Sequence, residues 1–232
     1  MMLRDWLDSI LNLFYPRVCA ACGESLLKDE ETVCLKCRYT LPRTGYERYP
    51  DNPLAQTFYG RVNIHAVTAC YFFAKSGKVQ HLIHQLKYKG NKDAGVFLGK
   101  QLGESLKDAP LFQGIDVIIP VPLHPRRERQ RGYNQSLIIA QGISEVTGIP
   151  VGNQYLFRTK YNETQTRKTA EERYNNVKGI FELRRQEELK GKHVLLVDDV
   201  LTTGATLESC AHQLESVPGI TISIAAAACA GN

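Results

Sequence analysis

The sequence predicts an α/β fold built on a parallel sheet, with a small cysteine-containing module before it. Three observations support this expectation. Short apolar runs at 115–119, 194–197 and 220–228 have the length of strands. The first two lead through a polar loop into a segment with helical spacing, and such units are joined by right-handed crossovers into parallel sheets. Four cysteines between positions 19 and 37 mark the N-terminal part of the chain as a separate module.

The remaining elements follow from the same patterns. The helix at 79–90 carries His81, His84 and Lys87 off its apolar stripe. His81 and His84 have the spacing of a metal pair, but no carboxylate or cysteine accompanies them, so a solvated or ligand-facing side is favoured. Another helix follows Asn134, a residue suited to the N-cap position. Further segments are a strand at 61–73, a helix at 93–106, and short strands at 155–158 and 179–183.

The most informative stretch begins with the apolar run at 194–197. Four apolar residues in a row are typical of a strand buried on both faces. The run stops at Asp198 and Asp199, and a short polar loop then leads into a helix. A loop at the carboxyl end of a central strand that opens a helix is where open α/β sheets bind their ligands. The helical stripe consists of Leu207, Cys210, Ala211 and Leu214.

The loop has the chemistry of a phosphate-monoester site. The N–H groups that open a helix lack intrahelical partners, and the helix dipole favours an anion there. Small residues let the backbone approach, and hydroxyls add donors. The loop residues are Thr202, Thr203, Gly204, Ala205 and Thr206. Asp198 and Asp199 would repel that phosphate, so they suit ribose hydroxyls or a Mg²⁺ ion. The alternative interpretation is a buried strand, a helix cap and two solvated aspartates.

The cysteines near the N-terminus form two C-x-x-C pairs with eleven residues between them. Two such knuckles make a four-thiolate, tetrahedral zinc site, as in a small zinc ribbon. The predicted ligands are Cys19, Cys22, Cys34 and Cys37. Two disulfides are the competing interpretation, and a redox pair would leave the second C-x-x-C unexplained. Cys70, Cys210 and Cys229 lie in apolar surroundings and are expected in the core.

A second candidate anion site follows the strand at 115–119. Prolines force an extended or turning loop in the stretch from Pro120 to Gly132, and this stretch carries four arginines within six residues. The guanidinium group suits phosphate because its planar fork donates two hydrogen bonds at once. A basic surface loop that binds nothing, or that touches nucleic acid, is the alternative. The arginines are Arg126, Arg127, Arg129 and Arg131.

A long polar segment separates the two short strands at 155–158 and 179–183. Loops of this length in compact domains are often lids. Three cationic residues in the segment could close over a polyphosphate, as a hood above the sheet. The alternative is a solvent-exposed loop that binds nothing. The hood candidates are Arg167, Lys168 and Arg173.

The composition is that of a globular protein. The 232 residues are 43% hydrophobic and 23% charged, with a net charge of +5, which permits an anionic partner. No apolar run approaches the ~18 residues of a membrane span. The helical stripe from Leu3 to Phe14 is interrupted by aspartates and has no small-residue cleavage site after it, so we expect no signal peptide. We therefore expect a cytoplasmic protein.

The order of these motifs resembles the ComF family of competence-associated, phosphoribosyltransferase-like proteins. The acidic-pair loop resembles the phosphoribosyl-diphosphate (PRPP) signature of type I phosphoribosyltransferases. The other matching parts are the double C-x-x-C, 86–90, 120–123, 131–135, and 165–173 with Asn176. Prolines and a glycine between 41 and 53 indicate a linker after the cysteines. We therefore expect three parts: an N-terminal helix and zinc ribbon at 1–45, a linker at 46–60, and a domain at 61–232, for which the resemblance implies the type I phosphoribosyltransferase fold.

The resemblance also implies roles for particular residues. The loop from Thr202 to Thr206 would hold the 5′-phosphate of PRPP, and Asp198 and Asp199 would face its ribose hydroxyls and Mg²⁺. The pyrophosphate would bind the loop after the strand at 115–119. The residues implied there are Val121, Pro122, Leu123, Arg126 and Arg127. Zn²⁺ would be structural, and Mg²⁺ would arrive with PRPP.

Three functions are consistent with these expectations. The first is transfer of a phosphoribosyl group, in which a nucleophile displaces Mg²⁺-pyrophosphate from C1 of PRPP, associated with DNA uptake in natural transformation. The second is a non-catalytic PRPP- or nucleotide-responsive module whose zinc ribbon docks on single-stranded DNA or a helicase-like competence protein. The third is nucleobase salvage, to which a zinc ribbon is foreign. No stretch of the sequence identifies the acceptor, a catalytic base or an oligomeric state.

Overall fold

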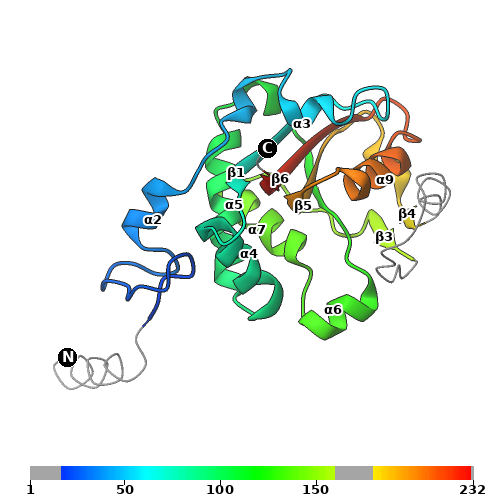
Figure 1. The fold of residues 1–232 in the computed structure, drawn as a ribbon. Helices are drawn as coiled ribbons and strands as arrows, with labels where there is room; N and C mark the ends of the chain where they lie inside the picture. Colours follow the sequence, from blue (N-terminus) through cyan, green and yellow to red (C-terminus); the bar gives the residue numbers. More distant parts are fainter. Residues whose placement is uncertain (1–16, 160–179, 231–232) are drawn as a thin grey trace.

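The computed structural model describes residues 17–159 and 180–230. A small module that contains the two C-x-x-C pairs lies to one side of a larger α/β domain (Figure 1). The domain is built on a four-stranded sheet in the order β1-β6-β5-β2, and all neighbouring strands are parallel. The strands are β1 (Ala66–Phe73), β2 (Val117–Pro120), β5 (His193–Leu201) and β6 (Thr221–Ala230). The predicted parallel α/β sheet is confirmed.

Helices cover both faces of the sheet. Alternate residues of β5 pack in opposite directions, with Leu195 and Val197 in one core cluster and Val194 and Leu196 in the other. The first cluster lies under α4 (Lys78–Tyr88), α5 (Lys92–Leu106) and α7 (Gln135–Thr147). The second lies under α3 (Pro53–Gln56) and α9 (Ala205–Leu214). A sheet buried on both faces explains the unbroken apolar run at 194–197.

Smaller elements complete the described chain. An antiparallel pair, β3 (Leu156–Arg158) and β4 (Phe181–Leu183), packs beside α9. The rest are α2 (Leu35–Thr40), η1 (Tyr46–Arg48), η2 (Pro110–Phe112), α6 (Pro125–Arg131) and η3 (Gln186–Leu189). Asn134 caps α7 as expected, because its side chain accepts a hydrogen bond from the backbone N–H of Ser136 at 3.1 Å.

The structure corrects the expected end of the strand at 194–197. Strand β5 continues to Leu201, so that the acidic pair lies within it rather than after it. The backbone stays paired because β6 runs alongside, with Asp198 opposite Ala226 and Leu201 opposite Cys229. The small alanines of β6 leave room for polar side chains at this end of β5.

The arginine-rich stretch is also different from the expected extended loop. Residues Pro125–Arg131 form α6, with His124 as the N-cap and proline at the first helical position. Proline is favoured there because its missing N–H would have no helical partner. The loop is thus limited to 121–124, and the arginines are carried by a short helix. The strand expected at 61–73 likewise begins only at Ala66.

Residues 46–60, expected to be a linker, are folded against the sheet. Asn52 is buried and caps α3, accepting hydrogen bonds from the N–H groups of Leu54 and Ala55. Phe58 is only 1% exposed and belongs to the second core cluster. The segment therefore contributes to the α/β domain itself, despite the prolines and glycines that suggested a flexible connection.

Two expected features lie outside the described residues. These are the N-terminal helix before Arg17 and the hood segment with Arg167, Lys168 and Arg173. Within 17–159 and 180–230, no helix combines the length and the apolar character needed to cross a membrane.

Helices α5 and α7 pack closely through a pair of glycines. A Cβ at Gly99 would lie 2.2 Å from the backbone oxygen of Ile139, and one at Gly142 would lie 2.5 Å from that of Val96. We expect Gly99→Ala to lower the free energy of unfolding by about 1–3 kcal/mol, because the backbones must separate. This loss should outweigh the better helix propensity of alanine. Urea denaturation is the measurement, with exposed Glu104→Ala on the same helix as the control, and equal stability would contradict the close packing.

Candidate functional site

The candidate site is centred on the two carboxylates near the carboxyl end of β5. The side chain of Asp199 is buried, and its Oδ1 lies 2.8 Å from Nζ of Lys87 on α4. Asp198 Oδ1 accepts a hydrogen bond from Ser136 Oγ on α7 at 2.9 Å and another from the N–H of Asp199 at 2.8 Å. Two helices of one layer therefore hold the acidic pair in place.

The pKa of Asp198 is raised to about 7. Burial is the main cause, because it disfavours the charged form, and the neighbouring charge of Asp199 adds to it. The hydrogen bond from Ser136 and the charge of Lys87 act in the opposite direction without cancelling these effects. The acidic pair is therefore short of positive charge, which is the condition that favours a bound cation.

The loop after β5 is shaped as an anion cradle. Thr202, Thr203, Ala205 and Thr206 are exposed, whereas Gly204 is buried. No described side chain caps α9, and its first intrahelical hydrogen bond runs from the N–H of Glu208 to the oxygen of Gly204. The N–H groups that precede Glu208 in the helix are consequently available to an anion.

Gly204 is required by the geometry of this loop. Its φ is +74°, in the left-handed region, and a Cβ there would lie 2.9 Å from Cζ of Phe58. A side chain at this position would strain the backbone and displace Phe58. The segment at 46–60 therefore packs against the loop through Phe58.

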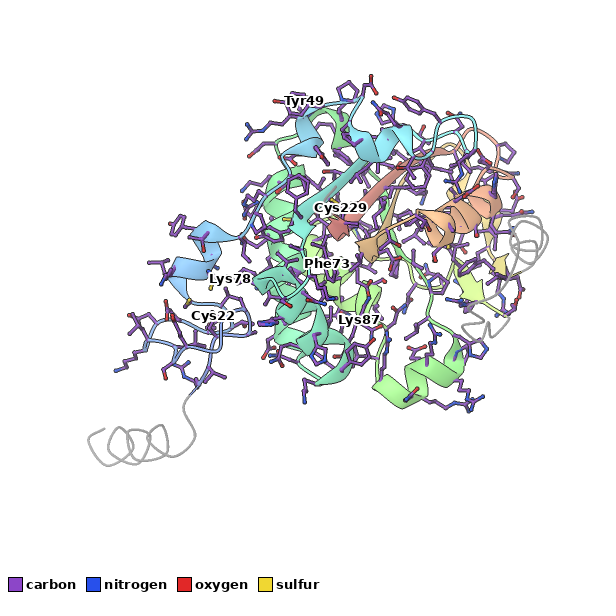
Figure 2. The ribbon with its side chains drawn as sticks, in the orientation of Figure 1. Cys22, Tyr49, Phe73, Lys78, Lys87 and Cys229 are labelled. Atoms are coloured by element: carbon purple, nitrogen blue, oxygen red, sulfur yellow. The ribbon has the colours of Figure 1, made fainter. Side chains whose placement is uncertain are left out.

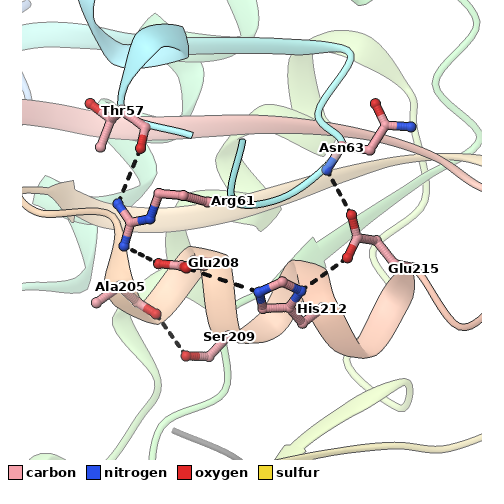
Figure 3. A network of polar contacts seen from close by, with 8 residues as sticks. All are labelled: Thr57, Arg61, Asn63, Ala205, Glu208, Ser209, His212 and Glu215. Atoms are coloured by element: carbon pink, nitrogen blue, oxygen red, sulfur yellow. Dashed lines mark hydrogen bonds and ion pairs between the residues drawn. The ribbon is translucent and has the colours of Figure 1, made fainter. Parts of the chain in front are cut away.

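Helix α9 is tied to the same segment on its outer side (Figure 3). The guanidinium group of Arg61 pairs with Glu208 and donates a hydrogen bond to the oxygen of Thr57 at 3.1 Å. Glu215, the C-cap residue of α9, accepts a hydrogen bond from the N–H of Asn63 at 2.6 Å. These contacts hold both ends of α9, and so the cradle at its start, relative to the sheet.

The loop after β2 lies beside the acidic pair. The N–H of Val121 donates to the oxygen of Val197 at 2.8 Å, and Asn134 Nδ2 donates to the oxygen of Val121 at 3.0 Å. The chain then enters α6, where Arg126 is exposed and Arg127 is half-buried. Of the predicted residues, 121–123, Asp198, Asp199 and 202–206 therefore meet at one edge of the sheet.

Two further cations lie near this edge, and the sequence analysis assigned neither of them to the site. Arg158, at the end of β3, has a buried Nε without a hydrogen-bond partner among the described residues. Burial lowers its pKa, as does the charge of Arg127, whereas Asp198 opposes this. Lys87 was placed on the polar side of its helix, but its pairing with Asp199 depends on how α4 packs. No local signal in the sequence marks Arg158.

The four predicted metal ligands come together in the N-terminal module. The sulfur atoms of Cys19, Cys22, Cys34 and Cys37 all lie within 4.8 Å of one another, so they could hold a metal ion such as zinc. Burial would raise the pKa of Cys19, but backbone N–H donors, chiefly that of Cys34, lower it to about 7. Thiolate-stabilising N–H groups and four converging sulfurs fit a zinc ribbon, and the expected core positions of Cys70, Cys210 and Cys229 are confirmed.

Helix α4 touches both the module and the acidic pair. Nδ1 of His81 lies 3.1 Å from the oxygen of Ala21, inside the first C-x-x-C, and Lys78 Nζ donates to Thr40 Oγ1 at 3.2 Å. Lys87, at the other end of α4, reaches Asp199. Figure 2 marks Cys22 and Lys78 near the module and Lys87 further into the domain. His81 is therefore a contact between the two parts, not half of a histidine metal pair.

Comparison with known proteins shows what part of the α/β domain is similar to. The family model "Phosphoribosyl transferase domain" matches residues 134–231. The chain is 34% identical over 136 residues to "DNA utilization protein YhgH" of Escherichia coli (strain K12), covering 57% of this chain and 59% of that protein. It is also 34% identical over 140 residues to "Competence protein F" of Haemophilus influenzae, covering 59% and 61%. The matched region thus spans about three fifths of each relative.

A shorter match is to "Competence protein ComFC" of Bacillus subtilis, which is 35% identical over 98 residues, or 42% of this chain and 38% of that protein. Among solved structures, purine phosphoribosyltransferase from Pyrococcus horikoshii is 26% identical over 58% of this chain and 71% of its own, with a TM-score of 0.37. Adenine phosphoribosyltransferase from Leishmania tarentolae is 16% identical over 79% and 78%, with a TM-score of 0.38. The chain is thus similar to competence-associated proteins over about three fifths of its length, and its residues 134–231 match the phosphoribosyl transferase family model, as the motifs predicted.

We expect one zinc ion per chain in protein purified under reducing conditions without a chelator, measured by elemental analysis. Cys37→Ser should abolish the stoichiometric zinc and lower the thermal midpoint, because so small a module depends on its metal to fold. Cys70→Ser is the matched control, since it alters another buried cysteine outside the cluster and should retain the metal. Wild-type protein without zinc would contradict this assignment.

We expect Asp198→Asn to raise the thermal midpoint at pH 8, without Mg²⁺ or PRPP, by about 2–4 °C. The folded protein keeps the Asp198 proton up to a pKa of about 7, while the unfolded chain releases it near the usual value of about 4. Stability is therefore lost as the pH rises between these values, and the neutral amide avoids that loss. The gain should be smaller at pH 5, and exposed Asp108→Asn should show no such dependence.

Proposed function

We propose that this relative of the ComF proteins binds PRPP with Mg²⁺ at the carboxyl edge of its sheet and transfers the phosphoribosyl group with release of pyrophosphate. One observation carries the proposal: an acidic pair at the end of β5 leads directly into a loop that opens an uncapped helix. The acidic pair suits the two hydroxyls of a sugar, and the loop beside it suits a phosphate monoester. The phosphoribosyl transferase domain supports the same ligand class.

The 5′-phosphate would bind the cradle at 202–206. Exposed threonine hydroxyls and the first N–H groups of α9 would donate to its oxygens, and the helix dipole would favour its charge. The buried Gly204 would let the chain turn tightly beneath the phosphate.

Asp198 and Asp199 would hold the ribose hydroxyls and a Mg²⁺ ion. Carboxylate oxygens are the ligands that Mg²⁺ prefers, and the raised pKa of Asp198 reflects a pair that lacks neutralising charge. The ion, when bound, would neutralise the acidic pair and the pyrophosphate. Lys87 would keep Asp199 oriented, and Ser136 would do the same for Asp198.

The leaving pyrophosphate would lie on the β2 side, over 121–123 and near Arg126, Arg127 and Arg158. The guanidinium groups would donate hydrogen bonds to oxygens on which negative charge grows as the C1–O bond breaks. Catalysis would then consist mainly of positioning and charge stabilisation by groups already in place. The cysteine cluster takes no part in this chemistry, because four thiolates would leave its metal no open position.

The names of the relatives extend the proposal to the handling of DNA during competence. The module exposes Leu27, Leu35 and Tyr39, which are 72%, 55% and 80% accessible. Exposed apolar side chains favour contact with a macromolecule. A helicase-like protein or single-stranded DNA would therefore dock on the module, and a non-catalytic PRPP-responsive role remains the second candidate function.

Calorimetry with Mg²⁺-PRPP tests the proposal with two variants that act on different ends of the ligand. Asp198→Asn combined with Asp199→Asn should weaken binding by at least about tenfold, or ~1.4 kcal/mol. Ala205→Glu should weaken it similarly, because it places a carboxylate in the phosphate cradle, yet glutamate in the first turn of a helix is compatible with folding.

Ribose-5-phosphate without Mg²⁺ provides the internal control. Its binding should be weakened by Ala205→Glu and much less by the double asparagine variant. If all three proteins bind PRPP alike, or if the wild type does not bind it, the proposal fails. Pyrophosphate release in the presence of acceptors separates transfer from binding alone, and binding without release would support the non-catalytic role.

A further inference from the structure

Glu208 is a carboxylate in the first turn of α9, next to the phosphate cradle at 202–206. Because each Cα–Cβ bond of a helix is tilted toward its N-terminus, the side chain of Glu208 leans over the turn that begins at Ala205. The proposed 5′-phosphate would bind at that turn. The side chain of Glu208 is only 14% exposed, so water screens its charge only in part. The function proposed above gives no reason for a negative charge beside a phosphate site.

An unpaired carboxylate at this place would oppose a bound phosphate in two ways. The two negative charges repel each other, and the repulsion is stronger where water is partly excluded. The carboxylate would also interact with the positive end of the helix dipole, which is the end that favours the phosphate. A cation paired with Glu208 reduces both effects. The affinity of the cradle therefore depends on what neutralises Glu208.

Arg61 supplies that cation (Figure 3). Its guanidinium group pairs with Glu208 through Nη2 and donates a hydrogen bond from Nη1 to the oxygen of Thr57 at 3.1 Å. His212 is the other described side chain near this carboxylate. Its Nε2 lies 3.9 Å from Glu208, whereas its Nδ1 lies 3.0 Å from Glu215. Arg61 is therefore the cation that serves Glu208.

The backbone of Arg61 belongs to the same short segment that packs against the loop. Phe58 is close to Gly204, where an added Cβ would lie 2.9 Å from the Cζ of the ring. The N–H of Arg61 donates to the oxygen of Phe58 at 3.0 Å, which ties the two residues together. Thr202, at the other end of the loop, borders an open pocket of about 720 Å³ instead. Phe58 and Arg61 thus contact the two ends of the first turn of α9.

We propose that Arg61 is a positioning residue for the phosphate group, which neutralises Glu208 so that the start of α9 accepts a dianion. The inference rests on the proposed function, because it takes a phosphate monoester as the ligand of the cradle. Arg61 acts through Glu208 and needs no contact with the ligand. A purely mechanical clamp is the competing explanation, since the same ion pair also ties α9 to the segment at 57–61.

Calorimetry with ribose-5-phosphate in the absence of Mg²⁺ measures the cradle separately from the acidic pair. We expect Arg61→Met to weaken binding by at least about fivefold, because Glu208 loses its counter-charge. Glu208→Met should bind ribose-5-phosphate at least as tightly as the wild type. The double variant, with methionine at both positions, should recover binding to within about twofold of the wild type.

The methionine variants of Glu208 separate charge from mechanics. Both lack the ion pair as completely as Arg61→Met does, so the loss of a mechanical clamp would weaken all three proteins alike. A double variant as weak as Arg61→Met would overturn the proposal. A Glu208→Met protein that binds clearly more weakly than the wild type would overturn it too, and this measurement does not depend on removing Arg61.

Two further variants serve as controls. Arg61→Lys keeps the positive charge and should bind within about threefold of the wild type. Lys107→Met removes a cation that is paired with Glu104 near the end of α5, at 2.6 Å, and should leave ribose-5-phosphate binding unchanged. Thermal melting of every variant checks that each protein is folded at the temperature of the binding measurement.

Binding of Mg²⁺-PRPP to the wild type keeps the two levels of inference apart. If the wild type binds neither PRPP nor ribose-5-phosphate, the proposed function fails and this inference fails with it. If the wild type binds both ligands and Arg61→Met binds them equally well, only the role of Arg61 is wrong.

Discussion

The structure depends on accommodating two adjacent carboxylates inside a paired strand. Burying such charges is unfavourable unless they are paired or hydrogen-bonded. Lys87 from α4 pairs with Asp199, and Ser136 from α7 donates a hydrogen bond to Asp198. The N–H of Asp199 adds a second hydrogen bond to Asp198. Both helices lie on the same face of the sheet. The acidic pair therefore constrains the position of this helical layer relative to the end of β5.

The fold was largely predictable because buried parallel strands and amphipathic helices have distinct periods in a sequence. The errors occurred where tertiary pairing overrides local pattern. Strand β5 continues through Asp198 because β6 pairs with it, and neither aspartate favours a strand by itself. Pro125 indicated a loop but occupies the first position of α6. The segment before Phe58 indicated a linker because it is rich in proline and glycine, yet it packs against the sheet.

The residues of the candidate site also fall into two groups, those predictable from a local pattern and those brought in by tertiary packing. Asp198, Asp199 and Gly204 were predicted as site residues because they lie close together in the sequence, in a pattern typical of a ligand-binding loop. Lys87 and Arg158 approach the acidic pair from elements that are distant in the chain, and only the packing of α4 and β3 brings them there. The pocket beside the phosphate loop was not predictable for the same reason, since Gln56 and Phe72 become neighbours of Thr202 only in the folded sheet.

The N-terminal module is structurally continuous with this arrangement. Cys34 and Cys37 belong to the same core cluster as Leu82 and Leu86 of α4, so no solvent layer separates the module from the domain. The eleven-residue helix contacts a cysteine knuckle through His81 and the acidic pair through Lys87. At 1.5 Å per residue, a helix of this length joins two places that lie apart in the molecule. Helix α4 thus connects the cysteine cluster to the acidic pair on β5 by direct contacts near its two ends.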